Sequence, residues 1–134
     1  MASGYQADGR LIEPLTDFAG LYARSAEHHD QAPFNLPRAW VEQKSSLNLA
    51  TPLNFATTAD ILGGNSGSPV VNEKGEFVGI IFDGNEPSLS GRYAYDPAQN
   101  RSIAVDSAAI VEALRQVYHA NALVAELESG HAAP

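Results

Sequence analysis

Ser66 stands in the segment GGNSGSPVV, from Gly63 to Val71, whose residue types and spacing suit a serine nucleophile on a tight turn. A serine attacks a carbonyl carbon when its Oγ is exposed and backbone N–H groups point at the oxyanion that forms. Gly64, two residues earlier, would let its own N–H and that of Ser66 point toward the same oxyanion. A glycine-rich turn that only leads into a strand has the same composition, so this pattern alone leaves both interpretations open.

The residues after this serine predict a β-hairpin, because apolar residues flank the turn sequence NEKG on both sides. Folding the chain at this turn pairs Val71 with about Phe77, and the same register brings the serine opposite about Phe82. Asp83 and Gly84 should then line the pocket that the serine faces. An Asp-Gly pair is also a common turn dipeptide, which is the plain alternative.

The composition indicates a soluble, globular chain with the length of one domain. Of its 134 residues, 16 are acidic and 8 are basic, which gives a net charge of −8 with no basic cluster. Nucleic acid is therefore not an expected partner, and no apolar run is long enough to span a membrane. The chain has no cysteine, and its four histidines lack zinc-ligand spacing, so neither a metal nor another cofactor is expected.

The hydrophobic periodicity predicts an α+β chain that is mainly β, with a helical lead-in segment at 1–53 and a β portion at 54–134 that ends in a helix. Residues 1–13 carry few apolar positions and predict a loose start. Helical spacing begins at Leu15, with Thr16 as the candidate N-cap. The other expected elements are a short helix at 37–44, strands at 54–58, 91–95 and 102–105, and helices at 106–118 and 121–128.

The block TADILGGNSGSPVVNEKGEFVGIIFDGN resembles the nucleophile segment of the bacterial dipeptidyl-peptidase VII/XI family. Members of this family are serine exopeptidases with a chymotrypsin-like double β-barrel. The likeness runs from about Phe18 to the last helix, through LYARSAEHHDQAPFNLPRAW and NRSIAVDS. The resemblance implies that residues 54–134 are the C-terminal β-barrel portion of such a peptidase, and that the protein is periplasmic or secreted.

The resemblance also implies a role for each residue of the expected pocket. Ser66 would be the nucleophile, and the N–H groups of Gly64 and Ser66 would form the oxyanion hole. Asp83 would bind the free α-ammonium of the peptide, so that the enzyme releases N-terminal dipeptides. Phe82 and Gly84 would contact the substrate in the first specificity pocket. Relatives that prefer Asp or Glu before the scissile bond carry arginine at the position of Gly84, so glycine here predicts a hydrophobic preference.

The base that would activate Ser66 is not expected in this chain. The family's base histidine and orienting aspartate belong to an N-terminal barrel, outside the likeness. His28 and His29 adjoin acidic residues in a polar segment, whereas His119 and His131 fall at a helix end and in the tail. We therefore expect a fragment that is inactive alone, whose partners are peptides with a free N-terminus and the missing N-terminal barrel of the same protein. The apolar edge of a half-barrel could also pair two copies as a homodimer.

Two alternatives remain open. A trypsin-like endopeptidase of the glutamyl-endopeptidase kind has a similar GNSGSP turn, and it would cut within blocked peptides. A non-enzymatic binding domain could keep the same scaffold. Upstream sequence that encodes a barrel with a histidine and an aspartate would favour the peptidase over this second alternative.

Overall fold

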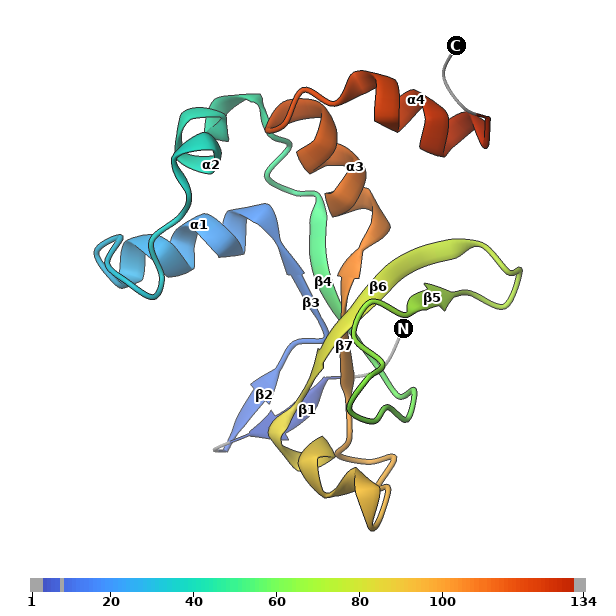
Figure 1. Ribbon diagram of the computed structural model, residues 1–134. Helices are drawn as coiled ribbons and strands as arrows, with labels where there is room; N and C mark the ends of the chain where they lie inside the picture. The colour runs from blue at the N-terminus through green and yellow to red at the C-terminus, as the bar shows by residue number, and fades with distance from the viewer. Residues whose placement is uncertain (1–3, 8, 132–134) are drawn as a thin grey trace. The chain divides into compact units, whose positions relative to one another are not determined.

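The computed structural model describes residues 4–7 and 9–131, and contacts divide the chain into two units (Figure 1). The first, called the sheet unit, comprises Met1–Thr16 and Pro52–Ser107. The second, called the helical unit, comprises Asp17–Thr51 and Ala108–Pro134. The sequence suggested a boundary between residues 53 and 54, with one segment before it and one after it. Each unit of the structure instead combines two separate parts of the chain.

Two antiparallel sheets form the sheet unit. One is the β1–β2 hairpin, and the other has five strands in the order β3-β4-β7-β6-β5. The strands are β1 (Tyr5–Ala7), β2 (Arg10–Ile12), β3 (Leu15–Asp17), β4 (Pro52–Thr57), β5 (Pro69–Val71), β6 (Phe77–Gly84) and β7 (Ser102–Asp106). The mixed helix and strand content agrees with the sequence-based fold class, while closure into a chymotrypsin-like double barrel stays a prediction.

The β5–β6 hairpin has the register that the sequence predicts, because Val71 pairs with Phe77. Its turn is a type I turn with a bulge: the Gly75 N–H donates to the Asn72 carbonyl at 2.9 Å, and the Asn72 N–H donates to the Glu76 carbonyl at 3.0 Å. Gly75 has the positive φ that this turn requires, at 79°. The Asn72 Oδ1 atom also accepts the Glu76 N–H at 3.0 Å, so the turn is fixed by side chain and backbone together.

The prediction of a loose start at 1–13 is wrong. Tyr5–Ala7 and Arg10–Ile12 form the β1–β2 hairpin, and Gly9 takes a φ of 72° in its turn. Each strand has only three residues, and all three residues of β2 are exposed. Such short, solvated strands leave no hydrophobic alternation that a sequence pattern could reveal.

The predicted strand at 91–95 is also absent. The short helix η2 (Glu86–Arg92) takes up its first residues, and it begins where the Ser88 N–H donates to the Asn85 carbonyl at 2.9 Å. Tyr93 is 94% exposed, so this aromatic residue does not pack on the sheet in the way its strand propensity suggested.

Helix α1 (Phe18–Glu27) is capped by Asp17 and not by Thr16. The Asp17 Oδ1 atom accepts the Gly20 N–H at 2.7 Å. Thr16 is still in β3, where its Oγ1 atom accepts the Asn54 N–H at 3.1 Å. Asp17 caps the helix because the Thr16 hydroxyl already accepts a hydrogen bond from the neighbouring strand.

The helical unit packs around aromatic side chains. Its further helices are α2 (Arg38–Glu42), η1 (Lys44–Ser46), α3 (Ser107–Gln116), which begins in the sheet unit, and α4 (Asn121–Ser129). Phe18 is fully buried and meets Trp40 edge to face at 5.6 Å, and the Trp40 Nε1–H donates to the Tyr118 hydroxyl at 3.1 Å. The Tyr22 hydroxyl donates to the Trp40 carbonyl at 2.6 Å, and burial raises the pKa of Tyr22. No helix in the described ranges is long and apolar enough to cross a membrane.

Gly79 marks the closest packing within the sheet unit. A Cβ at this position would overlap the Val105 carbonyl oxygen of the neighbouring strand and would lie 2.7 Å from Cε1 of Phe55. Both groups belong to the sheet itself, so neither can withdraw easily. Only glycine fits where β6 crosses the Phe55 ring.

Replacing Gly79 by alanine should therefore destabilise the sheet unit. We expect Gly79→Ala to lower the free energy of unfolding by about 1–3 kcal/mol, the usual cost of overpacking a close contact. Urea unfolding followed by circular dichroism measures the change. Gly75→Asn is the matched control, because nothing lies within 4 Å of a Cβ there and asparagine tolerates a positive φ. Equal midpoints for Gly79→Ala and the parent chain would contradict this account of the packing.

Candidate active site

Two consecutive tight turns, at 62–65 and 65–68, lie between β4 and β5, and Ser66 belongs to the second. The Asn65 N–H donates to the Leu62 carbonyl at 3.1 Å, and the Ser68 N–H donates to the Asn65 carbonyl at 2.9 Å. Gly64 and Gly67 occupy the third positions of these turns with φ values of 104° and 90°. Residues other than glycine rarely adopt this conformation, which explains both glycines on either side of the serine.

The side chain of Asn65 fixes the first turn from within. Its Oδ1 atom accepts the Leu62 N–H at 2.7 Å, while its own N–H serves the Leu62 carbonyl. In the part of the chain that the structure describes, the N–H groups of Gly64 and Ser66 have no acceptor, and neither has the Ser66 hydroxyl. Ser66 is exposed. Its hydroxyl and two backbone donors are therefore available to a ligand.

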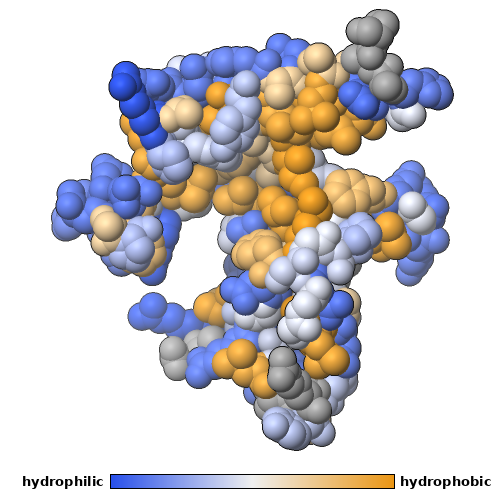
Figure 2. All heavy atoms as spheres, in the orientation of Figure 1, coloured by the Kyte–Doolittle hydropathy of each residue, from blue (hydrophilic) through white to orange (hydrophobic). Residues whose placement is uncertain are grey.

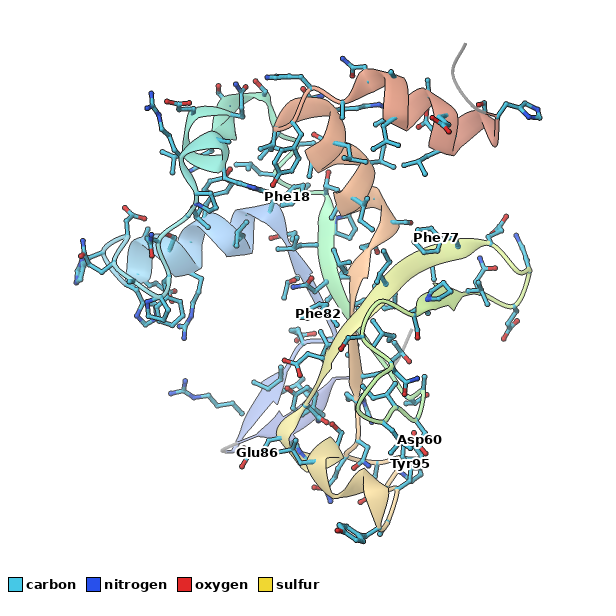
Figure 3. The ribbon with its side chains drawn as sticks, viewed as in Figure 1. Phe18, Asp60, Phe77, Phe82, Glu86 and Tyr95 are labelled. Atoms are coloured by element: carbon cyan, nitrogen blue, oxygen red, sulfur yellow. The ribbon has the colours of Figure 1, made fainter. Side chains whose placement is uncertain are left out.

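Strand β6 holds this turn in place through a pair of backbone hydrogen bonds. The Gly67 N–H donates to the Ile81 carbonyl at 2.8 Å, and the Ile81 N–H donates to the Ser68 carbonyl at 3.0 Å. The next residues of β6 are Phe82 (labelled in Figure 3) and Asp83, which follow directly after the point where β6 holds the serine turn.

A pocket of about 270 Å³ lies where the turn meets the end of β6. It is lined by Ile61, Leu62, Gly63, Asn65, Ser66, Ile81, Phe82, Asp83, Gly84, Ser88 and Leu89. The structure thus brings Ser66, Phe82, Asp83 and Gly84 to one pocket, as the hairpin register suggested, and Gly64 lies in the turn before Ser66 without lining the pocket. Their chemical roles remain predictions.

Among the described residues that line this pocket, Asp83 is the only charged one. It is exposed, and its Oδ1 atom accepts the N–H of the next residue, Gly84, at 2.8 Å. This local bond fixes the orientation of the carboxylate while the second oxygen stays available in the described structure. The described lining of the pocket thus offers an anionic group next to a serine hydroxyl and includes no cationic side chain.

The other large side chains around the pocket are apolar and partly solvated. Leu62 is 53% exposed, Phe82 is 47% exposed and Leu89 is 78% exposed. Figure 2 shows such hydrophobic residues, in orange, at the surface of the chain. An apolar side chain of a ligand could bury this surface, which favours its binding.

Hydrogen bonds outside the pocket hold its two flanking loops. The Tyr95 hydroxyl donates to the Thr58 carbonyl in the segment that carries Asp60 (Figure 3). The Thr57 Oγ1 atom accepts the Ala59 N–H at 2.8 Å, so the chain leaving β4 is turned toward the serine loop. Sequence patterns did not single out these contacts, because Tyr95 and Thr58 are far apart in the chain.

Sequence reasoning also missed Ser88, which faces Gly84 across the pocket wall. A Cβ on Gly84 would overlap the Ser88 Oγ atom and would lie 3.5 Å from Cδ1 of Ile61. The helix that carries Ser88 replaces part of an expected strand, so no sequence signal placed this hydroxyl in the pocket.

No histidine lines the pocket, and residues 1–16 and 52–107, which make up the sheet unit, contain none. His28, in the helical unit, stacks on Phe34 with ring centroids 3.7 Å apart, which is a packing role. Within the described residues, no cluster of His, Asp and Glu side chains could hold a metal ion. The sheet unit therefore supplies no histidine to its own serine turn.

Several known proteins have sequences similar to that of this chain. A family model described as Peptidase S46 matches residues 1–129. An Asp/Glu-specific dipeptidyl-peptidase of Shewanella putrefaciens is 31% identical over 134 residues, which cover 95% of this chain and 18% of that protein. Dipeptidyl-peptidase 7 of Phocaeicola vulgatus is 58% identical over 55 residues, which cover 41% of this chain and 8% of that protein.

Solved structures show the same fold. DPP11 of Porphyromonas endodontalis in complex with the dipeptide Arg-Glu superposes with a TM-score of 0.82 at 24% identity, over 94% of this chain and 19% of that one. The same protein in complex with substrate gives a TM-score of 0.78 at 26% identity, over 94% of this chain and 19% of that one. The chain thus spans less than a fifth of the length of these structures and of the relatives above.

Proposed function

Since the chain belongs to the peptidase S46 family, we propose that it is the nucleophile-bearing part of a serine dipeptidyl-peptidase, with Ser66 as the nucleophile. One observation carries this proposal: an exposed serine hydroxyl and two backbone N–H groups without acceptors in the described structure lie in two adjoining turns beside a pocket that Asp83 lines. The dipeptidyl-peptidases among the similar proteins support the same class of reaction.

In the proposed reaction, the Ser66 Oγ atom attacks the carbonyl carbon of the second residue of a peptide. The serine proton passes to a base, and the N–H groups of Gly64 and Ser66 donate to the oxyanion of the tetrahedral intermediate. The base then protonates the leaving amine as the C–N bond breaks, and water releases the dipeptide from the acyl-enzyme.

The base and its orienting acid have to be supplied by residues outside the sheet unit, because that unit contains no histidine. We place them in a further barrel of the same protein, packed against this chain in a chymotrypsin-like arrangement. Without a base, a serine hydroxyl is a weak nucleophile at neutral pH. The chain of 134 residues by itself should therefore have little or no peptidase activity.

Asp83 supplies the selectivity for dipeptides in this proposal. Its carboxylate lies at the pocket beside the serine turn and is the only charge among the described lining residues, so it can pair with the α-ammonium of a free N-terminus. A peptide anchored in this way presents the carbonyl of its second residue to the serine. An endopeptidase has no need for such an anchor.

The pocket favours hydrophobic side chains before the scissile bond. The described residues of its lining include no cation that could pair with an Asp or Glu side chain, and the Asp83 carboxylate would repel such an acidic side chain. Ile61, Phe82 and Leu89 instead present apolar surface. The similar proteins include both an Asp/Glu-specific enzyme and dipeptidyl-peptidase 7, so the lining of this pocket, and not the likeness, supports the preference.

The first test is labelling of the serine by a fluorophosphonate in the protein produced from its complete gene, with peptide mapping of the adduct. We expect the adduct on Ser66, and we expect Ser66→Ala to lose labelling and at least about 10³-fold in dipeptide release. Ser68→Ala is the matched control, since only the backbone of Ser68 supports the turn. An adduct on another serine, or dipeptide release retained in Ser66→Ala, would contradict the proposal.

The second test asks whether the substrate needs a free N-terminus. We expect cleavage of a dipeptide reporter with a free amine and none of its acetylated form. Asp83→Asn should lower kcat/KM for the free-amine reporter about 10- to 100-fold, the usual worth of a hydrogen bond to a charged group. Cleavage of blocked peptides at an undiminished rate would instead identify an endopeptidase.

The third test compares reporters with Leu, Phe and Asp before the scissile bond. We expect kcat/KM for the Leu and Phe reporters to exceed that for the Asp reporter by at least about tenfold, because a carboxylate side chain would meet the Asp83 carboxylate and no cation among the described lining residues. A preference for the Asp reporter would overturn the proposed specificity and leave the proposed reaction intact.

A further inference from the structure

The Ser88 hydroxyl occupies the space beside Gly84 that any side chain at residue 84 would have to enter. A Cβ built on Gly84 overlaps the Ser88 Oγ atom, and both residues line the pocket that Ser66 faces. The wall of the pocket at this point is thus a glycine backbone with a serine hydroxyl against it. The size of the pocket here depends on both residues together.

The Ser88 hydroxyl is not free to turn away. It donates to the Asn85 carbonyl at 2.6 Å, and the Ser88 N–H donates to the same oxygen at 2.9 Å. Rotating the side chain would break the first of these bonds. The hydroxyl proton is committed to Asn85, so the oxygen faces the pocket as an acceptor.

Asn85 is itself held on three sides. It is 7% exposed, and its N–H donates to the Arg101 carbonyl at 2.9 Å. Its side-chain Nδ2 atom donates to the Gln99 carbonyl at 2.8 Å, and its Oδ1 atom accepts the Arg101 N–H at 2.9 Å. These bonds fasten the start of η2 to the chain that enters β7. The Asn85 carbonyl, and with it the Ser88 hydroxyl, therefore has a fixed position.

Arg101 holds the other part of this junction, which is the loop that leads into β7. It is 3% exposed, and its guanidinium donates to the carbonyls of Pro97 and Asn100 at 3.0 and 2.8 Å. The loop before β7 is thus wrapped around a buried side chain. A pocket wall built on such a junction resists deformation by a ligand.

We infer that Ser88 is a specificity-determining residue of this pocket, whose hydroxyl sets the depth available to the substrate side chain beside Gly84. The inference rests on the proposed function, because it takes the pocket as the site of the residue before the scissile bond. Asn85 is a positioning residue that acts through Ser88. With the hydroxyl in place, the pocket accepts branched aliphatic side chains better than aromatic ones.

The experiment changes the size of residue 88 in both directions and measures kcat/KM for Leu and Phe dipeptide reporters on the protein produced from its complete gene. Ser88→Gly removes the obstruction and should raise the Phe-to-Leu ratio about tenfold. Ser88→Thr keeps the hydroxyl and adds a methyl group, so it should lower the ratio by a similar factor. One methylene in an apolar pocket has effects of this size.

Glu86→Ala is the matched control. Glu86 is an exposed residue of the same short helix that does not line the pocket (Figure 3). It should leave the Phe-to-Leu ratio unchanged. A similar change of ratio in Glu86→Ala and Ser88→Gly would mean that the ratio follows helix stability and would overturn the inference.

A double-mutant cycle tests the contact with Gly84 directly. Gly84→Ala should lower kcat/KM for both reporters about tenfold when Ser88 is present, because its Cβ displaces the hydroxyl. In the Ser88→Gly background the same change should cost less than about twofold, since the overlapping atom is gone. Equal losses in both backgrounds would contradict the contact.

The outcomes separate this inference from the proposed function. If the parent protein releases no dipeptide and Ser66 takes no fluorophosphonate, the proposed function fails, and the inference fails with it. If the parent protein is active and labelled but the residue 88 variants keep the parent Phe-to-Leu ratio, only the role of Ser88 is overturned.

Discussion

The backbone hydrogen bonds that join Ile81 to Gly67 and Ser68 determine where the serine turn lies relative to Asp83. They place the end of the serine turn against the middle of β6, and β6 is fixed on its other edge by β7. From this point the chain direction alone brings Asp83 to the serine. The approach of these two residues therefore depends on an antiparallel pairing and not on any one side-chain contact.

The second constraint is conformational. Gly64 and Gly67 hold positive φ values in successive turns, and Asn65 closes the first turn with its own side chain. A backbone held in this way keeps its N–H groups oriented before a substrate arrives. Donors that need no reorganisation are the most effective stabilisers of a developing oxyanion, so the rigidity of the turn matters to the proposed chemistry as much as the serine does.

The sequence predicted the parts of this site that local rules control. The Val71 and Phe77 pairing followed from a turn type and from counting along two strands, and it brought Asp83 and Gly84 to the serine. Ser88 could not be predicted in this way. Its place depends on Asn85, which bonds to residues that follow a loop and belong to another strand.

The two incorrect predictions of secondary structure, at 91–95 and at 1–13, have the same physical cause. Residues 91–95 have the composition of a strand, but the Asn85 junction turns the preceding chain into a helix. The strands of the β1–β2 hairpin are too short and too exposed to show alternation. Long-range pairing overrides weak local preference in both places, which is the common limit of propensity arguments.

The interleaving of the two units has a consequence for how the chain acquires its structure. Each unit is assembled from two stretches separated by a stretch that belongs to the other. Contacts between residues far apart in the chain slow folding, because the entropy of loop closure opposes them before they stabilise anything. During synthesis, β4 cannot gain its partner β7 until the serine turn and both strands of the hairpin have emerged. The serine turn is therefore synthesised before β7, the strand that completes its sheet.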